Sequence, residues 1–422
     1  MKIVPLALFF TLAAISLTIA QPDPPELASW LRNTTGLTGY NNLPANVQLV
    51  RYSANSVYVS SSDIPGYSIG PWPGDPNIPA NQNFVFKIPR NPSVNNGTKT
   101  PTPLGTIAAW VNGVATFNAL DAMSYQNQNI WHQNAVFVEA SSFDACLGHP
   151  APGGVYHHHQ NPRCLYAADS SQHSPLLGYA FDGYPMYGPY GFANADGSGG
   201  IKRMESGYRL RSITQRTTLP DGTVLSPSQY GPNVSGGFPL GYYVEDFEYV
   251  EGLGTLDRYN GRWTVTPEYP DSIYAYFVTI DSSGNSAYPY AIGPGYYGVV
   301  EMANITSHGH VAVTESVMTY NPVTAVRVGG SGVLPSRIGL YQNYPNPFNP
   351  STTIRYELAR GGEVSLRVYD LFGREVVILV DGVKPAGTYE VNFDAGAWPG
   401  GVYFYRLQAG RSGLVKKLVL LK

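Results

Sequence analysis

The strongest structural signal in this 422-residue chain is the run Ile273-Tyr274-Ala275-Tyr276-Phe277-Val278-Thr279-Ile280. It is dominated by β-branched and aromatic residues, which are enriched in β-strands because they pack well on a pleated surface. We therefore expect a strand over residues 273–280, and we work outward from it in both directions.

Shorter strand signals lie on the N-terminal side of this run. Residues 84–88 are rich in Val, Phe and Ile and stop at Pro89, and residues 135–138 form a short apolar run that we also interpret as a strand. The only helical pattern is a short one at residues 25–33, and we expect no helix longer than about three turns. Turn sequences separate the runs: Asp75-Pro76-Asn77, Asn95-Asn96-Gly97, Asp196-Gly197, Asp221-Gly222 and Asn260-Gly261. A mostly-β fold is the prediction.

The composition supports this fold class and excludes two kinds of partner. The chain has 46 Gly and 35 Pro residues, which implies many turns and short elements. Only 13% of the residues are charged, and the formal net charge is −3. Without a basic stripe the chain is not expected to bind nucleic acid, and without a cationic amphipathic helix it is not expected to bind a membrane surface.

The N-terminus predicts export. Residues 1–20 combine Lys2, a nearly uncharged apolar run, and the small residues Thr18 and Ala20 at the −3 and −1 positions of a cleavage site. A membrane anchor is the alternative, but the apolar run is short and interrupted by polar residues. No other stretch is apolar over the length needed to span a bilayer, so we do not expect an integral membrane protein.

Histidines are concentrated in one part of the chain. Six of the eight fall in a window of 42 residues: His132, His149, His157, His158, His159 and His173. The only two cysteines, Cys146 and Cys164, flank four of them, and in an exported protein we expect these cysteines to form a disulfide. The alternative is a pair of unlinked buried thiols.

A strand at residues 156–159 would make a metal site possible. Side chains alternate along a strand, so His157 and His159 would share one face, about 7 Å apart at Cα, while His158 would point to the other face. Both rings could then reach one ion, with His149, His173 or His132 as a third ligand. Imidazoles without thiolates favour zinc or copper. Asp144 or Asp182 could orient a ring from behind.

Two other interpretations of these residues stay open. The histidines could be buried hydrogen-bonding residues that hold loops together, or a solvated patch. Tyrosines in Gly- and Pro-rich segments could instead stack on sugar rings or contact a partner protein; they are Tyr184, Tyr187, Tyr190, Tyr296 and Tyr297. The sequence identifies no general base, and so we assign no catalytic residue and leave open whether the protein is an enzyme.

The last part of the chain differs from the rest in composition and in hydrophobic pattern. Residues 321–333 include Gly329-Gly330-Ser331-Gly332 and are expected to form a flexible linker. Residues 334–422 show about seven short alternating strands, the size of a small immunoglobulin-like sandwich. This segment resembles the type A C-terminal sorting domain of the type IX secretion system. The resemblance rests on residues 340–350, 354–356, 368–376, 385–387, 400–404 and 416–422.

That resemblance implies that residues 334–422 act as a secretion signal and contribute no catalysis. Such domains carry cargo from the periplasm across the outer membrane and are then usually removed. The cargo is released or attached to surface lipopolysaccharide. Partners implied for residues 334–422 are therefore the type IX secretion machinery and surface lipopolysaccharide.

The preceding part, residues 40–303, resembles the YHYH family. The family is named for a Tyr-His-Tyr-His motif, which here is Tyr156-His157-His158-His159, so the third residue departs from it. The surrounding segments match better: residues 131–135, 144–146, 148–150, 162–165, 173–189 and 257–262. The resemblance implies no particular reaction.

Together these observations predict a large irregular β-rich YHYH domain followed by a small immunoglobulin-like β-sandwich. The expected boundaries are a signal peptide at 1–20, a cargo domain at 21–320, a linker at 321–333 and a sorting domain at 334–422. The protein is expected to be secreted or to reside on the outer cell surface, with a metal site in its histidine cluster. The alternative function is a non-catalytic surface module that binds glycan or protein through its tyrosines.

Overall fold

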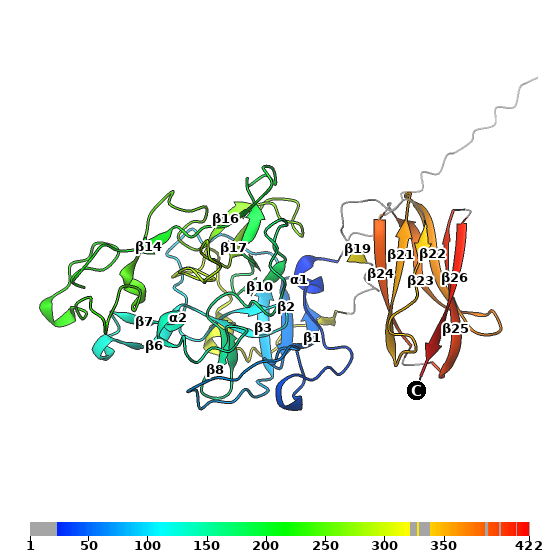
Figure 1. Cartoon of the computed structure of the whole chain (residues 1–422), viewed down its shortest axis with the longest axis horizontal. Coiled ribbons are helices and arrows are strands. Elements are labelled where there is room, and N and C mark those ends of the chain that lie inside the picture. The colour runs from blue at the N-terminus through cyan, green and yellow to red at the C-terminus, as the bar shows by residue number, and fades with distance from the viewer. Residues whose placement is uncertain are drawn as a thin grey trace, which may run out of the picture. The chain divides into compact units, whose positions relative to one another are not determined.

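The computed structural model describes residues 23–320, 327–328, 338–384, 387–395, 398–410 and 412–421. The expected signal peptide lies outside the described residues. So does the expected linker, apart from Arg327–Val328. Two compact units are present, Pro24–Tyr320 and a C-terminal unit within Asn321–Lys422, and each is described by itself (Figure 1). As predicted, the chain is mostly β.

The first unit contains a four-stranded antiparallel sheet in the order β18-β1-β2-β3. Its strands are β1 (Val47–Tyr52), β2 (Ser56–Ser61), β3 (Phe84–Pro89) and β18 (Met318–Thr319). In β3 burial alternates from residue to residue, which agrees with the strand predicted at residues 84–88. One face of β3 therefore packs against the core.

The second sheet has eight strands in the order β16-β17-β11-β10-β4-β5-β9-β8. They are β4 (Thr106–Trp110), β5 (Ala115–Phe117), β8 (His149–Pro150), β9 (Tyr156–His158), β10 (Leu176–Ala180), β11 (Pro185–Tyr187), β16 (Gly261–Thr264) and β17 (Ile273–Phe277). The pairs β5–β9 and β11–β17 are parallel, and the other pairs are antiparallel. The histidine-bearing strands β9 and β8 thus lie at one end of this sheet.

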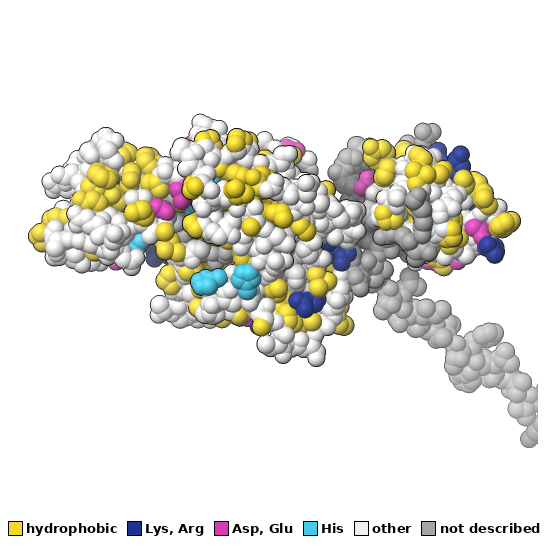
Figure 2. All heavy atoms as spheres, turned by 90° about the horizontal axis from the view of Figure 1, so that it is seen from below, with side chains coloured by type: hydrophobic (Ala, Val, Ile, Leu, Met, Phe, Trp, Pro, Cys, Tyr) yellow, Lys and Arg dark blue, Asp and Glu magenta, His cyan; other side chains and the backbone are white. Residues whose placement is uncertain are grey.

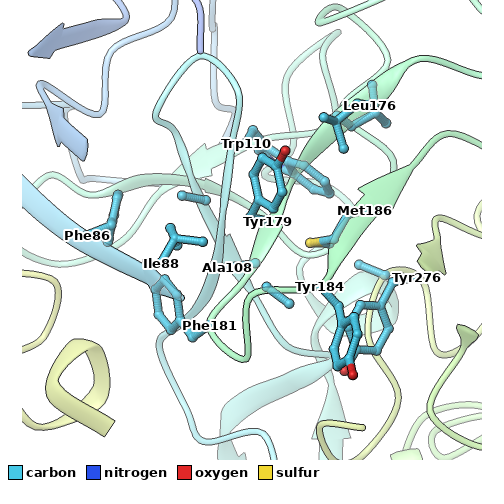
Figure 3. Packing of buried hydrophobic residues seen from close by; sticks show 14 of the residues in the cluster. Phe86, Ile88, Ala108, Trp110, Leu176, Tyr179, Phe181, Tyr184, Met186 and Tyr276 are labelled. Carbon is cyan, nitrogen blue, oxygen red and sulfur yellow. The ribbon is translucent and has the colours of Figure 1, made fainter. Parts of the chain in front are cut away.

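The core lies between the two sheets and on both faces of the larger one. All of β10 is buried, as is β17 beyond its first residue, and consecutive buried residues mean that both faces are covered. Figure 3 shows Phe86 and Ile88 of β3 packed near Phe181, with Trp110 and Tyr179 nearby. This explains why the run at 273–280 is continuously apolar instead of alternating, although the strand itself ends at Phe277.

Smaller elements complete the first unit. Three two-stranded ribbons pair β6 (Leu120–Ser124) with β7 (His132–Asn134), β12 (Tyr190–Phe192) with β13 (Ile201–Arg203), and β14 (Tyr208–Leu210) with β15 (Phe247–Tyr249). The helices are α1 (Pro25–Ala28), α2 (Ala135–Val138) and α3 (Met302–Thr306), with single 3₁₀ turns at Tyr40–Asn42, Tyr125–Asn127, Pro227–Gln229 and Val244–Asp246. Among the described residues no helix is long and apolar enough to span a bilayer.

The strand predicted at residues 135–138 is wrong. These residues form α2, one helical turn that follows β7 and lies beside β6 and β7 in Figure 1. Four apolar residues cannot distinguish a helical turn from a short strand by periodicity alone. Here Ala135 is buried while Phe137 is 44% exposed, which gives no alternation of buried and exposed faces. Glu139 follows this turn directly, so the turn fixes the position of the Glu139 backbone.

The C-terminal unit is a two-sheet β-sandwich, as predicted. One sheet has the order β19-β24-β21-β20 and the other β23-β22-β25-β26. The strands are β19 (Arg327–Val328), β20 (Gly339–Leu340), β21 (Ser351–Leu358), β22 (Gly362–Tyr369), β23 (Glu375–Lys384), β24 (Gly387–Asp394), β25 (Gly401–Ala409) and β26 (Ser412–Leu420). Alternating side chains such as Val364, Leu366 and Val368 enter its own core, separate from that of the first unit.

The low charge content is visible on the surface. Figure 2 shows one face on which Lys, Arg, Asp and Glu side chains form small scattered patches among polar and apolar ones. No stripe of basic side chains crosses this face. A continuous phosphate-binding track would require one.

Candidate metal centre

Three histidine rings converge in the first unit. The Nε2 atoms of His149 and His157 are 3.1 Å apart, and those of His157 and His159 are 3.0 Å apart. One ring nitrogen from each lies within 4.8 Å of the other two, and all three side chains are buried. In a tetrahedral site with metal–nitrogen bonds of about 2.0–2.1 Å, neighbouring ligand atoms are about 3.3 Å apart. The two distances that involve His157 are close to this value.

The sheet brings these residues together. β8 and β9 are antiparallel, with His149 directly opposite His157, and His159 follows two residues later on the same face. The close approach depends on Gly148, because a Cβ at this position would lie 2.5 Å from the Tyr156 hydroxyl. That hydroxyl is held by a 3.0 Å hydrogen bond to Asp144.

The disulfide predicted between Cys146 and Cys164 is confirmed, with a Cα–Cα distance of 5.1 Å. Its two ends enclose His149, His157 and His159 in one closed loop. Asp144 lies just before this loop, and its side chain accepts hydrogen bonds from the backbone N–H groups of Cys146 and Gly148. The loop that carries the histidines is therefore anchored at both ends.

The hydrogen bonds of the three rings define which nitrogen carries the proton. His157 Nδ1 faces the carbonyl of Val155 at 3.2 Å, and His159 Nδ1 faces the carbonyl of Asn118 at 2.5 Å. A carbonyl oxygen only accepts, so both Nδ1 atoms carry hydrogen.

In the third ring, that of His149, Nδ1 also carries the hydrogen, and here a serine hydroxyl oxygen accepts it. His149 Nδ1 lies 2.9 Å from Ser142 Oγ, whose own hydrogen is donated to the Glu139 carbonyl. The Ser142 oxygen therefore accepts from His149. As a result, the Nε2 atom of each ring keeps its lone pair, which is the tautomer that binds a metal through Nε2.

Burial favours the neutral form of two of the rings, those of His157 and His149. Burial, followed by the neighbouring His159 and His149, holds the pKa of His157 well below its usual range. Burial also lowers the pKa of His149, in spite of the opposing charge of Glu139. Neutral imidazoles bind metal without first releasing a proton.

Glu139 is a member of this site that the sequence did not reveal. Its Oε2 atom is buried and without a hydrogen-bond donor, 3.2 Å from His159 Nε2 and 3.5 Å from His149 Nε2. No motif spacing points to Glu139, because it reaches the site from α2 instead of from the histidine loop.

The three histidines line an open cleft with a volume of about 500 Å³. Its walls include the carboxylates of Asp75, Asp121 and Glu139, and no Lys or Arg of the described residues lines it. Burial and the nearby Glu139 raise the pKa of Asp121. The cleft is therefore negatively charged and gives solvent access to the nitrogen atoms.

The other two histidines proposed as ligands lie elsewhere. His132, on β7, contacts Glu245 Oε1 at 2.6 Å through Nδ1. His173 Nδ1 contacts the carbonyl of Ser174 at 2.8 Å, and its ring packs against Tyr187. Neither belongs to the group of converging nitrogens.

The remaining polar candidates also serve other purposes. His158 is fully buried on the opposite face of β9, where its ring packs against Tyr156 and neither ring nitrogen has a hydrogen-bond partner. Asp144 and Asp182 do not orient the three rings. Asp182 accepts hydrogen bonds from Tyr276 and Gly298. The groups behind the rings are instead a serine hydroxyl and two backbone carbonyls.

The tyrosines considered for glycan binding are mostly inside the protein. Tyr184, Tyr187 and Tyr296 are buried, and Tyr190 and Tyr297 are half-buried. A stacking platform needs exposed ring faces. These five residues therefore do not form such a platform.

Comparison with known proteins divides the chain into two matched regions. Residues 85–287 match the family model of the YHYH protein, and all three converging histidines lie within the match. Residues 342–421 match the model of the secretion system C-terminal sorting domain. The chain has no significant match among curated proteins. The sorting domain implies contact with the secretion machinery and a location outside the cell, either secreted or on the outer surface.

Proposed function

We propose that this secreted or outer-surface protein, whose residues 85–287 match the YHYH family, binds one zinc or copper ion through His149, His157 and His159. The observation that carries the proposal is the convergence of three Nε2 lone pairs, with neighbours 3.0–3.1 Å apart and every Nδ1 hydrogen engaged by an oxygen. Neutral imidazoles suit both metals, and the donor set contains no thiolate because the cysteines are joined.

We further propose that the chain has the domain boundaries expected from its sequence. In this proposal residues 1–20 are removed as a signal peptide, residues 21–320 are the cargo, residues 321–333 link the two units, and the type IX machinery recognises residues 334–422. Attachment of the mature protein to lipopolysaccharide is part of the same proposal. Mass spectrometry of the mature termini, with a search for a lipid-linked C-terminus, tests it.

The test of the metal centre is a direct measurement of bound metal. Residues 21–422, purified without a histidine tag, are exposed to Zn²⁺ or Cu²⁺, passed over a desalting column and analysed by mass spectrometry for metals. We expect about one ion per chain, and loss of that ion in the double variant His157→Ala/His159→Ala.

The chain supplies its own matched control. His308 and His310 have the same spacing as His157 and His159 but are exposed, and we expect His308→Ala/His310→Ala to retain the ion. A folded wild-type protein without stoichiometric metal would refute the proposal. So would equal loss of metal in the two double variants.

A further inference from the structure

We infer that the cleft hydrolyses neutral or cationic acyl compounds, that is esters or amides, with Glu139 as the base that takes a proton from the attacking water. This inference rests on the proposed metal centre and adds to it a reaction, a base and a class of substrate. It draws on three features of the structure: an open side of the site, the position of Glu139, and the charge of the cleft.

The site has an open side. All three histidines line the cleft, so an ion held by their Nε2 atoms would face the cavity of about 500 Å³. Structural zinc sites are closed by four protein ligands, whereas catalytic ones have three protein ligands and an exchangeable position. Among the described residues, the ligand atoms that all lie within 4.8 Å of one another belong to these three histidines alone. The arrangement therefore matches the catalytic type.

Glu139 lies beside the open side without joining the group. Its Oε2 is within 3.5 Å of two of the three Nε2 atoms and has no hydrogen-bond donor of its own. A buried carboxylate oxygen normally has a donor, so this atom is ready to accept a hydrogen bond from a water molecule at the exchangeable position.

The backbone of Glu139 is fixed relative to the histidines. Its N–H donates to the Ala135 carbonyl at 2.9 Å, which closes α2. Its carbonyl accepts from Ser142, and the Ser142 oxygen contacts His149. One chain of hydrogen bonds thus positions both the base and a ligand, which is the kind of preorganisation that proton transfer in catalysis needs.

The charge of the cleft indicates the substrate class. Asp75, Asp121 and Glu139 line it and no Lys or Arg does, so a phosphate or sulfate ester would meet only repulsion beyond the ion itself. Sites of phosphoryl transfer supply cationic side chains for the oxygens of the transferred group. Apolar walls, including Leu104, Phe117 and Leu120, suit an acyl chain or a peptide side chain instead.

The reaction is a simple addition and elimination. A water molecule gives one proton to Glu139 Oε2 while its oxygen forms a bond to the carbonyl carbon of the substrate. The bond from that carbon to the leaving nitrogen or oxygen then breaks, and the leaving group takes the proton from Glu139. The products are a carboxylic acid and an amine or alcohol. Water is the only co-reactant, and no electron is transferred.

The experiment uses residues 21–422 loaded with Zn²⁺. Bound zinc, melting temperature and kcat/KM are measured for wild type, Glu139→Gln, and Glu251→Gln, an exposed glutamate outside the cleft that serves as the matched control. The probes are 4-nitrophenyl acetate, a neutral ester, and 4-nitrophenyl phosphate, an anionic one. We expect Glu139→Gln to keep its zinc but to lose about 10²–10⁴-fold in kcat/KM for the acetate. Glu251→Gln should match wild type, and the phosphate should react far more slowly than the acetate.

Each outcome separates the two proposals. A wild type without zinc refutes the hydrolysis, and a wild type that takes up neither zinc nor copper refutes the metal centre as well. A wild type with zinc that hydrolyses the acetate no faster than His157→Ala/His159→Ala refutes the hydrolysis alone. Loss of zinc from folded Glu139→Gln would make Glu139 a ligand and overturn its role as the base. Phosphate hydrolysis as fast as that of the acetate would overturn the substrate class.

Discussion

Alternation along a single strand explains why His157 and His159 meet while His158 is directed to the other face of β9. The sequence was sufficient to predict this, because the direction of a side chain in a strand depends only on its position. His149 was one of three histidines proposed as the third ligand, and the register of β8 on β9 places it opposite His157. Glu139 and the oxygens behind the rings could not be predicted, because they come from segments with no sequence relation to the histidines.

The hydrogen bond behind His149 gives the first prediction. Replacement of Ser142 by alanine removes the oxygen that accepts from His149 Nδ1, so this ring is free to rotate or to adopt the other tautomer. Loss of such a supporting group typically lowers metal affinity about 10–100-fold. Competition with a chromophoric chelator measures the affinity of Ser142→Ala beside Ser141→Ala, whose adjacent side chain is exposed. Equal affinities in the two variants would contradict the tautomer assignment.

The second prediction concerns pH and a residue outside the site. The hydrogen bond that His132 Nδ1 donates to Glu245, together with the charge of Glu245, raises the pKa of His132 above its usual value of about 6.5. Protonated His132 is therefore more favourable in the folded chain than in the unfolded one. Its contribution is complete below about pH 6.5 and is lost as the pH rises through the elevated pKa.

We expect the free energy of unfolding of wild type to fall over this interval by about 1 kcal/mol or less, because both side chains are partly exposed. The variant His132→Gln should not show this loss. Chemical denaturation at a series of pH values between about 6 and 9 makes the comparison. An increase in the stability difference between wild type and variant with rising pH would reverse the sign and refute the assignment.

At the level of elements, some strands of the first unit were predictable and their arrangement was not. Residues 84–88 and 273–277 are strands because β-branched and aromatic residues favour a pleated surface. The parallel pairing of β5 with β9 joins residues about 40 positions apart, and no local pattern encodes it. The error at α2 has the same origin, since four apolar residues do not determine their own conformation.

The close packing of Gly148 against Tyr156, where β8 pairs with β9, gives the third prediction. A methyl group on residue 148 would lie 2.5 Å from the Tyr156 hydroxyl and 2.9 Å from the His157 carbonyl, and neither atom is free to move away. We expect Gly148→Ala to cost about 1–3 kcal/mol of stability and to weaken metal binding. At Gly236 the same substitution would meet no atom within 4 Å, so Gly236→Ala is the control. Thermal unfolding and metal titration of both variants provide the measurement, and unchanged values for Gly148→Ala would contradict it.

For the whole molecule, two separate cores correspond to the two regions that match different family models. The sandwich could be predicted as a fold, because its strands alternate regularly and its sequence resembles a known sorting domain. The first unit could be predicted only as irregular β structure. Its sheet order, with non-sequential neighbours such as β5 and β9, depends on contacts made across the whole unit.

The fourth prediction tests this division. A chain that ends after Tyr320 loses the match to the secretion sorting domain but keeps its own core. We expect it to accumulate in the periplasm of the producing cell while still binding the same amount of metal. Cell fractionation followed by metal analysis of the purified protein measures both properties. Metal loss on truncation would mean that the sorting domain contributes to the site.

The closed loop between Cys146 and Cys164 has a consequence for the resistance of the histidine site to proteases outside the cell. His149 is separated from His157 and His159 by an exposed turn at Pro152 and Gly153, where a protease could cut. Because both sides of such a cut stay joined through the disulfide, a single nick divides the loop without releasing either fragment. The ring of covalent bonds thus gives the three imidazoles a tolerance to proteolysis that an open segment would lack.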